Sequence, residues 1–174
     1  MSYILIQKVT VSSGSSPTIA LTTLPSTFVD LKLFITAKST DTTINRSLIY
    51  LTLNGNTTNT DYISYNWYTE DGSNNAEYTT STTKTRMTSL VSASKSGISS
   101  YAFGTSAVWI NNYNDSSNYQ SIYSTVTQRA LSTNYDNWGS GVTWKQNAAI
   151  TDITLNMDVG NFAAGSTVHL YGLK

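Results

Sequence analysis

The side chains best suited to chemistry in this chain are one histidine and a small group of carboxylates. His169 lies between Val168 and Leu170 in an alternating stretch, and no G-x-S-x-G sequence supplies a serine for it to activate. A strand histidine on a wet or interfacial face is the simpler interpretation. With one histidine and no cysteine, a zinc site is excluded in practice. The sequence therefore predicts no catalytic residues, no metal and no cofactor.

Three carboxylates, Glu70, Asp71 and Glu77, fall in one polar stretch. Paired carboxylates carry out glycoside hydrolysis, so a hydrolase site has to be considered there. The run EDGSNN could also wrap a calcium ion with side-chain and carbonyl oxygens, but it lacks the spacing of an EF-hand loop. Solvated loop carboxylates explain the three residues equally well. We therefore expect a protein that is not an enzyme.

Four aromatic residues, Tyr62, Tyr65, Trp67 and Tyr68, lie close together and form the single candidate binding site. Tyrosine and tryptophan stack on sugar rings, and they also anchor protein interfaces and cores. We favour core or subunit packing for this run, and a glycan-stacking site is the alternative.

The composition narrows the possible partners. Charged residues make up 11% of the chain, where about 25% is usual, and ten basic residues balance ten acidic ones. No basic field exists to attract a nucleic-acid backbone. The apolar run at residues 4–6 is too short for a membrane span or for the core of a signal peptide. Neither nucleic acid nor membrane is an expected partner, and the near-zero net charge favours self-association.

Short alternating or apolar segments separated by turn residues fill the chain. We expect strands at residues 3–11, 18–23, 30–38, 48–53, 62–68, 85–93, 107–111, 119–129 and 141–145, and two more within residues 150–174. About ten short strands without helical periodicity predict an all-β fold in one domain, residues 1–174. The expected architecture is an antiparallel β-sandwich, jelly-roll-like.

We also make predictions for four segments between these strands. Residues 70–76 and 131–140 are predicted as loops, and residues 76–80 as one helical turn at most. Asn54-Gly55 directly follows an apolar strand, and both residues tolerate positive φ, so this dipeptide predicts a β-hairpin turn.

The last twenty-five residues form the clearest two-strand unit of the chain. Apolar and polar residues alternate before and after a loop rich in glycine, asparagine and serine. The pattern predicts a closing β-hairpin or corner. The residues expected to face the core are Ile153, Leu155, Met157, Val168 and Leu170.

This closing sequence, ITDITLNMDVGNFAAGSTVHLYGLK, preceded by Trp144 and Ala148-Ala149, resembles an ending found repeatedly in small virion proteins of tailed bacteriophages. The segments YILIQ, residues 3–7, and LPSTFVDL, residues 24–31, look like the opening of the same group. The resemblance implies a jelly-roll-like β-sandwich, typically a homotrimer, acting as capsid cement or decoration or as the tip of a fibre. It brings no catalytic residues with it.

The leading hypothesis from the resemblance is a capsid cement protein, made in the host bacterial cytoplasm and located in the virion. It would bridge capsomers of the major capsid protein through its N-terminal strand and aromatic surface. The alternative is a tail-fibre or spike tip whose aromatic run stacks on host surface glycans. A third hypothesis is a free-standing lectin or glycosidase. The chain lacks heptads and fixed repeats, which disfavours a complete fibre but not a tip.

Overall fold

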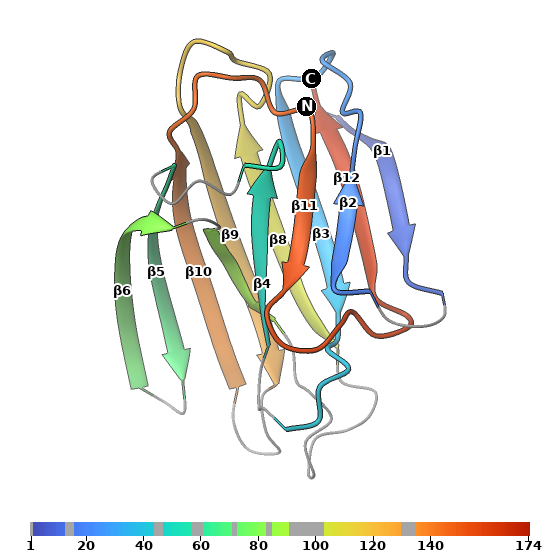
Figure 1. Cartoon of the computed structure of the whole chain (residues 1–174), viewed down its shortest axis with the longest axis vertical. Helices are drawn as coiled ribbons and strands as arrows, with labels where there is room; N and C mark the ends of the chain where they lie inside the picture. The colour runs from blue at the N-terminus through green and yellow to red at the C-terminus, as the bar shows by residue number, and fades with distance from the viewer. Residues whose placement is uncertain are drawn as a thin grey trace.

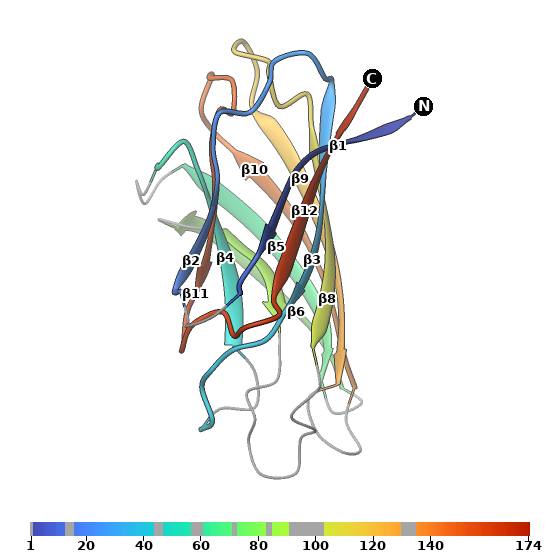
Figure 2. The same ribbon diagram turned by 90° about the vertical axis from the view of Figure 1, so that its right-hand side faces the viewer.

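The computed structural model describes residues 2–12, 16–43, 47–56, 61–70, 73–82, 85–90, 103–129 and 135–174. Within these residues the chain consists of strands and loops, and no helix occurs. The strands are β1 (Tyr3–Thr10), β2 (Thr18–Leu21), β3 (Asp30–Ala37), β4 (Ser47–Leu53), β5 (Tyr62–Glu70), β6 (Ser73–Thr82), β7 (Thr85–Leu90), β8 (Gly104–Asn111), β9 (Gln120–Arg129), β10 (Tyr135–Trp144), β11 (Ile153–Met157) and β12 (Thr167–Leu173). They form two antiparallel sheets packed face to face (Figure 1 and Figure 2). The predicted antiparallel β-sandwich is confirmed.

The two sheets differ in size. The larger has eight strands in the order β1-β12-β3-β8-β9-β10-β5-β6, and the smaller has four in the order β2-β11-β4-β7. In Figure 1 the strands β2, β11 and β4 lie in front of the larger sheet, and β5 and β6 form its far edge. One face of the larger sheet therefore packs on the smaller sheet, and its other face points away from it.

The core lies between the sheets and is built from alternating positions of the strands. Leu31, Leu33 and Ile35 of β3 are buried, while the residues between them are more exposed. The five side chains predicted to face inward from the closing strands are all buried; they are Ile153, Leu155, Met157, Val168 and Leu170. Each such side chain contributes roughly 1.5–3 kcal/mol to folding.

The closing unit of the chain is a corner between the sheets, because β11 belongs to the smaller sheet and β12 to the larger one. The buried ring of Phe162 lies in the loop between them. Its N–H donates to the carbonyl of Ser16 at 2.8 Å, and the N–H of Ala163 donates to the carbonyl of Lys38, also at 2.8 Å. The loop thereby ties the end of the chain to two earlier segments.

The prediction of a β-hairpin at Asn54-Gly55 is wrong, although these residues do form a turn. Both residues have positive φ, 51° and 64°, and the N–H of Asn56 donates to the carbonyl of Leu53 at 2.8 Å. The flanking strands lie in different sheets, because β4 pairs with β11 and β7 while β5 pairs with β10 and β6. The Asn54 amide also accepts the N–H of Thr151 at 2.8 Å, so the turn helps to position the start of β11.

Two segments predicted as loops are largely strands. Residues 73–76 belong to β6, so the helical turn proposed at 76–80 is also wrong, and residues 135–140 belong to β10. Asparagine, serine and glycine are weak strand formers, and here pairing with β5 imposes the extended conformation. The remaining parts of three predicted segments, residues 71–72, 91–93 and 131–134, lie outside the described residues.

Candidate functional site: an aromatic face on the larger sheet

The outward face of the eight-stranded sheet carries a row of residues that are neighbours only because of strand pairing. Antiparallel registers place one residue from each of seven consecutive strands side by side. In sheet order these residues are Tyr171, Lys32, Trp109, Tyr123, Gly141, Tyr65 and Tyr78. Five of the seven are aromatic. We call their rings, together with Tyr3, Phe34 and Trp67, the aromatic face.

The rings at the centre of this face contact one another across the strands. The centroid of the Trp67 ring lies 5.9 Å from that of Tyr123, with an interplanar angle of 30°. Tyr65 lies 6.1 Å from Trp67, and Trp109 lies 5.4 Å from Tyr123. Rings at these separations attract each other beyond the area that they bury. The four side chains therefore form a continuous cluster across β5, β9 and β8.

A second ring cluster surrounds a lysine. The ammonium of Lys32 lies 4.6 Å from the ring centroid of Trp109, 4.7 Å from that of Phe34 and 5.1 Å from that of Tyr3. A cation within about 6 Å of a ring face is attracted by the quadrupole of the ring. Because Trp109 belongs to both clusters, the aromatic face runs without a break from β1 to β5.

Gly139 of β10 leaves room for the ring of Trp67 directly above the strand. A Cβ atom at Gly139 would be 2.2 Å from Cε2 and Cζ2 of Trp67, so the indole occupies the space above this glycine. A Cβ atom at Gly141, the next outward position of the strand, would meet nothing within 4 Å. Only Gly139 is thus needed for the placement of the indole.

The aromatic face is a surface and not a part of the core. Tyr65 is 49% exposed, Tyr123 is 40% exposed and Trp67 is 39% exposed. None of the outward side chains that the structure describes on β8, β9, β10 and β5 is charged. The functional groups exposed on these four strands are aromatic rings, hydroxyl groups and side-chain amides.

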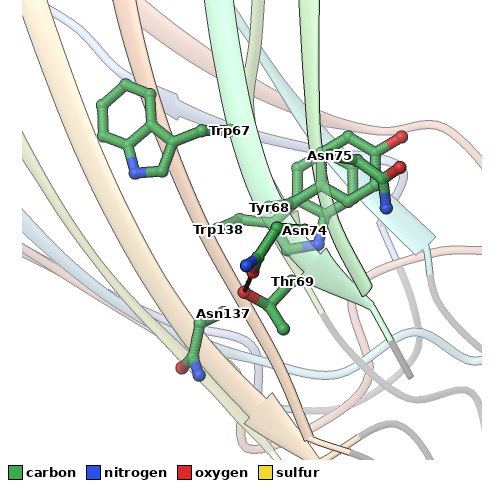
Figure 3. Close-up of a pocket in the computed structure, with 7 residues that line it drawn as sticks. All are labelled: Trp67, Tyr68, Thr69, Asn74, Asn75, Asn137 and Trp138. Carbon is green, nitrogen blue, oxygen red and sulfur yellow. Dashed lines mark hydrogen bonds between the residues drawn. The ribbon is translucent and has the colours of Figure 1, made fainter. Parts of the chain in front are cut away.

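A hollow of about 260 Å³ opens beside Trp67 where β10, β5 and β6 run together (Figure 3). Its outward side chains are those of Trp67, Thr69, Asn74 and Asn137. The hydroxyl of Thr69 donates to Oδ1 of Asn74 at 2.9 Å, which fixes that amide and leaves its Nδ2 as the donor end. Figure 3 shows the indole nitrogen of Trp67 on the side of its ring toward Asn137 and Thr69.

A second hollow, of about 250 Å³, lies on the same face closer to β3. It is lined by Phe34 and by residues of β8 and β9, including Thr105, Ala107, Thr125 and Thr127. Each hollow therefore combines an aromatic ring with hydroxyl or amide side chains.

The structure divides the four aromatic residues that the sequence placed in one site. Tyr65 and Trp67 point outward, but Tyr62 is fully buried, and its hydroxyl accepts the N–H of Leu53 at 3.0 Å. Burial raises the pKa of Tyr62 to about 12. Tyr68 is partly buried, and its ring stacks on that of Trp138 with centroids 4.1 Å apart. Residues 62 and 68 thus pack inward, so the run does not form one surface.

Several residues of the face were not predicted to belong to it. Trp109 and Tyr123 are outward residues of β8 and β9, but only the strand order β8-β9-β10-β5 brings them next to Trp67. Asn74 and Asn137 lie in segments predicted as loops. Alternation in the sequence could have marked the two aromatic residues as outward-facing, but it could not have shown which strands are neighbours.

The residues considered for catalysis do not come together in the described parts of the chain. His169 lies on the outward side of β12, paired with Phe34 and Lys8. No group of three histidine or carboxylate residues able to hold a metal ion occurs among the described residues. Asp71 and the side chain of Glu70 lie outside them. No helix in the described parts is long and apolar enough to cross a membrane.

Comparisons of the chain with protein-family models, with curated proteins and with solved structures found no match.

Proposed function

We propose that the chain is a virion structural protein of a tailed bacteriophage that decorates and stabilises the capsid as a homotrimer bound to the major capsid protein. The resemblance of both chain ends to small phage virion proteins supports this function. The structural observation that carries it is the apolar tip of β1, residues 3–5, because this segment has the properties of an assembly surface.

The β1 tip exposes three consecutive apolar residues. Tyr3 is 51% exposed, Ile4 is 42% exposed and Leu5 is 50% exposed, and consecutive strand residues point to opposite faces. β1 is also the outermost strand of the larger sheet, and Figure 2 shows its N-terminal end projecting from the sandwich. An apolar edge strand is a template for pairing with another chain. A register shift between Leu5 and Gln7 sets the tip apart from the rest of the strand.

The finer architecture that we propose is a jelly roll with an inserted hairpin. In an eight-stranded jelly roll the two sheets have the strand orders 1-8-3-6 and 2-7-4-5. If β2 to β8 and β11 are taken as these eight strands, the smaller sheet has the first order. The larger sheet has the second order, with β9 and β10 inserted between β8 and β5 and with β12 and β1 added beside β3. Jelly rolls occur in both viral capsid and lectin domains, which is compatible with the proposed function.

Replacing the apolar tip tests the proposal. The double variant Ile4→Thr with Leu5→Thr keeps strand propensity but removes the apolar surface. We expect it to fold, to lose the trimer in light-scattering mass measurements, and to fail to bind capsids purified without this protein. Val29→Thr is the matched control, because Val29 is equally exposed, at 51%, but lies outside the tip. A double variant that still forms trimers and still decorates these capsids would contradict the proposal.

A second test concerns the particle. Capsids that lack the protein should release their genome at a lower temperature than decorated capsids, and adding the purified protein should restore their resistance. Equal resistance with and without the protein would argue against a stabilising role.

The uncharged part of the aromatic face, on β8, β9, β10 and β5, favours a second candidate function, a receptor-binding tip of a tail fibre or spike. Tyrosine and tryptophan exposed among hydroxyl and amide groups suit recognition of host surface glycans. Copy number distinguishes the two candidates. Quantitative mass spectrometry of purified particles should find hundreds of copies for a capsid decoration and only a handful for a fibre tip.

A further inference from the structure

We infer that the hollow beside Trp67 is a binding subsite for an uncharged sugar unit of a polysaccharide, with the indole of Trp67 as the stacking platform. The inference names the ligand class of the aromatic face. It rests on the proposed function only in requiring that the particle present this face outward.

The position of the indole supports a platform. One face of the Trp67 ring lies on Gly139, and the side chain keeps 39% of its surface exposed. A ring pressed flat against the sheet is already ordered, so stacking on it costs little conformational entropy. The apolar C–H face of a pyranose could lie on this ring as one flat surface on another.

The groups beside the platform are those that hydrogen-bond to sugar hydroxyls. Asn137 and Asn74 are exposed amides at the rim of the hollow, and each can donate and accept. The bond from Thr69 holds the Asn74 amide in one orientation. At about 260 Å³ the hollow is smaller than the roughly 300–1,000 Å³ typical of pockets for drug-sized ligands, which fits a single sugar unit.

The second hollow indicates that the ligand is a chain of sugars. Strand pairing places Phe34, Ala107, Thr125, Gly139 and Trp67 in one row across the sheet. The backbone positions of Phe34 and Trp67 are four strand spacings apart, roughly 19 Å. Small residues lie between the two rings. An extended oligosaccharide could therefore cross the strands with one unit near each ring.

Charge favours a neutral glycan over an anionic one and over a protein partner. The described outward side chains of β8, β9, β10 and β5, which surround the hollow beside Trp67, include no cation to pair with a carboxylate or sulfate. Lys32 is a cation at the far end of the row, with its ammonium 4.7 Å from the ring centroid of Phe34. Protein interfaces concentrate their binding energy in tryptophan, tyrosine and arginine, and the last is missing from this set. The β1 tip lies at the opposite end of the strand order from β5 and β6, so assembly through it can leave the hollow accessible.

The test uses the full-length protein in solution and a panel of soluble hexasaccharides of glucose, galactose, mannose and N-acetylglucosamine, with a sulfated hexasaccharide as the anionic probe. Isothermal titration calorimetry measures binding, and near-ultraviolet circular dichroism checks that each variant is folded. We expect at least one neutral hexasaccharide to bind and the sulfated probe not to bind.

Variants then locate the site. Trp67→Ala should weaken binding of the neutral hexasaccharide about tenfold or more, and Asn137→Ala about fivefold. Trp67→Phe should restore part of the affinity, because it restores a ring. Tyr119→Ala is the matched control, since Tyr119 is 57% exposed but lies outside the aromatic face, and it should change affinity less than about twofold.

Three outcomes would overturn the inference. The first is that no neutral hexasaccharide binds, and the second is that Trp67→Ala binds as tightly as the unaltered protein. The third is that Trp67 is protected from chemical oxidation in the purified oligomer but not in the monomer, which would make the face an interface between copies of this chain. None of these results depends on where the protein sits in the particle, so the proposed function could fail or succeed separately.

Discussion

The two halves of the eight-stranded sheet bury different kinds of side chain. In the half formed by β1, β12, β3 and β8, inward positions hold aliphatic residues such as Leu33, Leu170 and Val108. In the half formed by β9, β10, β5 and β6, inward positions include Ser124 and Ser140, whose hydroxyl oxygens lie 2.6 Å apart. Exposed rings concentrate on the outward side of this second half. The second half therefore exposes rings on its outward side and buries polar groups, although it also contributes apolar side chains such as Val142 and Trp144 to the core.

Each half also contains a ring that lies on a strand glycine, with opposite consequences. On β12 a Cβ atom at Gly172 would be 2.3 Å from Cγ of Phe28, whose ring is buried. On β10 the corresponding contact is between Gly139 and Trp67, whose ring is exposed. The same local arrangement closes the core in one half and makes a flat platform in the other. The two arrangements differ in the exposure of the ring, because the Phe28 ring is buried and the Trp67 ring is exposed.

The largest expected difference between the halves concerns inward-facing residues. Leu33→Ala should destabilise the protein by about 2–5 kcal/mol, because it leaves a cavity among fully buried aliphatic side chains. Ser140→Ala should cost only about 1 kcal/mol, since it removes the hydrogen bond to Ser124 and little volume. Denaturant unfolding of both variants measures the two free energies. Equal losses would mean that the second half depends on its inward packing as strongly as the first.

The two glycines provide the next test. Gly172→Ala should cost about 1–3 kcal/mol, because the buried Phe28 ring cannot move aside without disturbing the core. Gly139→Ala should cost less than about 1 kcal/mol, because the exposed Trp67 ring can rotate into solvent. The Gly139 variant should nevertheless change the tryptophan signals in near-ultraviolet circular dichroism. Gly141→Ala, where a Cβ atom has open space, is the control and should leave both measurements unchanged.

How far the sequence predicts this fold depends on the half. In the first half, the alternation of Leu31, Leu33 and Ile35 in β3, and of Val168 and Leu170 in β12, follows directly from burial of one strand face. The strands of the second half are harder to find. Residues 73–76 and 135–140 are rich in serine, asparagine and glycine, whose local preference is for turns, and pairing with β5, and for residues 135–140 also with β9, makes them strands.

The candidate site is less predictable than the fold for a related reason. Trp67 and Tyr65 stand out in the sequence, but so does Tyr62, which is buried. Tyr123 and Trp109 are distant from Trp67 in the chain, and no local pattern indicates that β10 pairs with β5. Strand order is a long-range property, so a site assembled across strands cannot be read from local periodicity.

The attachment of the second half to the smaller sheet should depend on pH. Burial raises the pKa of Tyr62 to about 12, and its hydroxyl accepts the N–H of Leu53 in β4. Because the folded state holds this proton more tightly than the unfolded state, its stabilising contribution is complete below about pH 10 and is lost between pH 10 and 12. At pH 11 the loss should be about 1.4 kcal/mol.

The measurement compares the unaltered protein with Tyr62→Phe, which cannot ionise at this position. From pH 9 to pH 11 the unfolding free energy of the unaltered protein should fall by about 1.4 kcal/mol relative to that of Tyr62→Phe, while the ionisation of the other tyrosines cancels. A difference that does not change with pH would show that the Tyr62 hydroxyl is not buried against the N–H of Leu53. The attachment of the second half would then have to come from other residues.

The smallest expected effect concerns the lysine that joins the two halves on the outward side. Lys32 contacts the rings of Phe34 and Trp109, and Trp109 in turn contacts Tyr123 of the second half. Lys32→Met keeps most of the side-chain volume and should cost about 0.5–1 kcal/mol. A double-mutant cycle with Phe34→Leu should give a coupling free energy of about 0.5 kcal/mol. Zero coupling would mean that the rings pack around the lysine without a favourable contact to its charge.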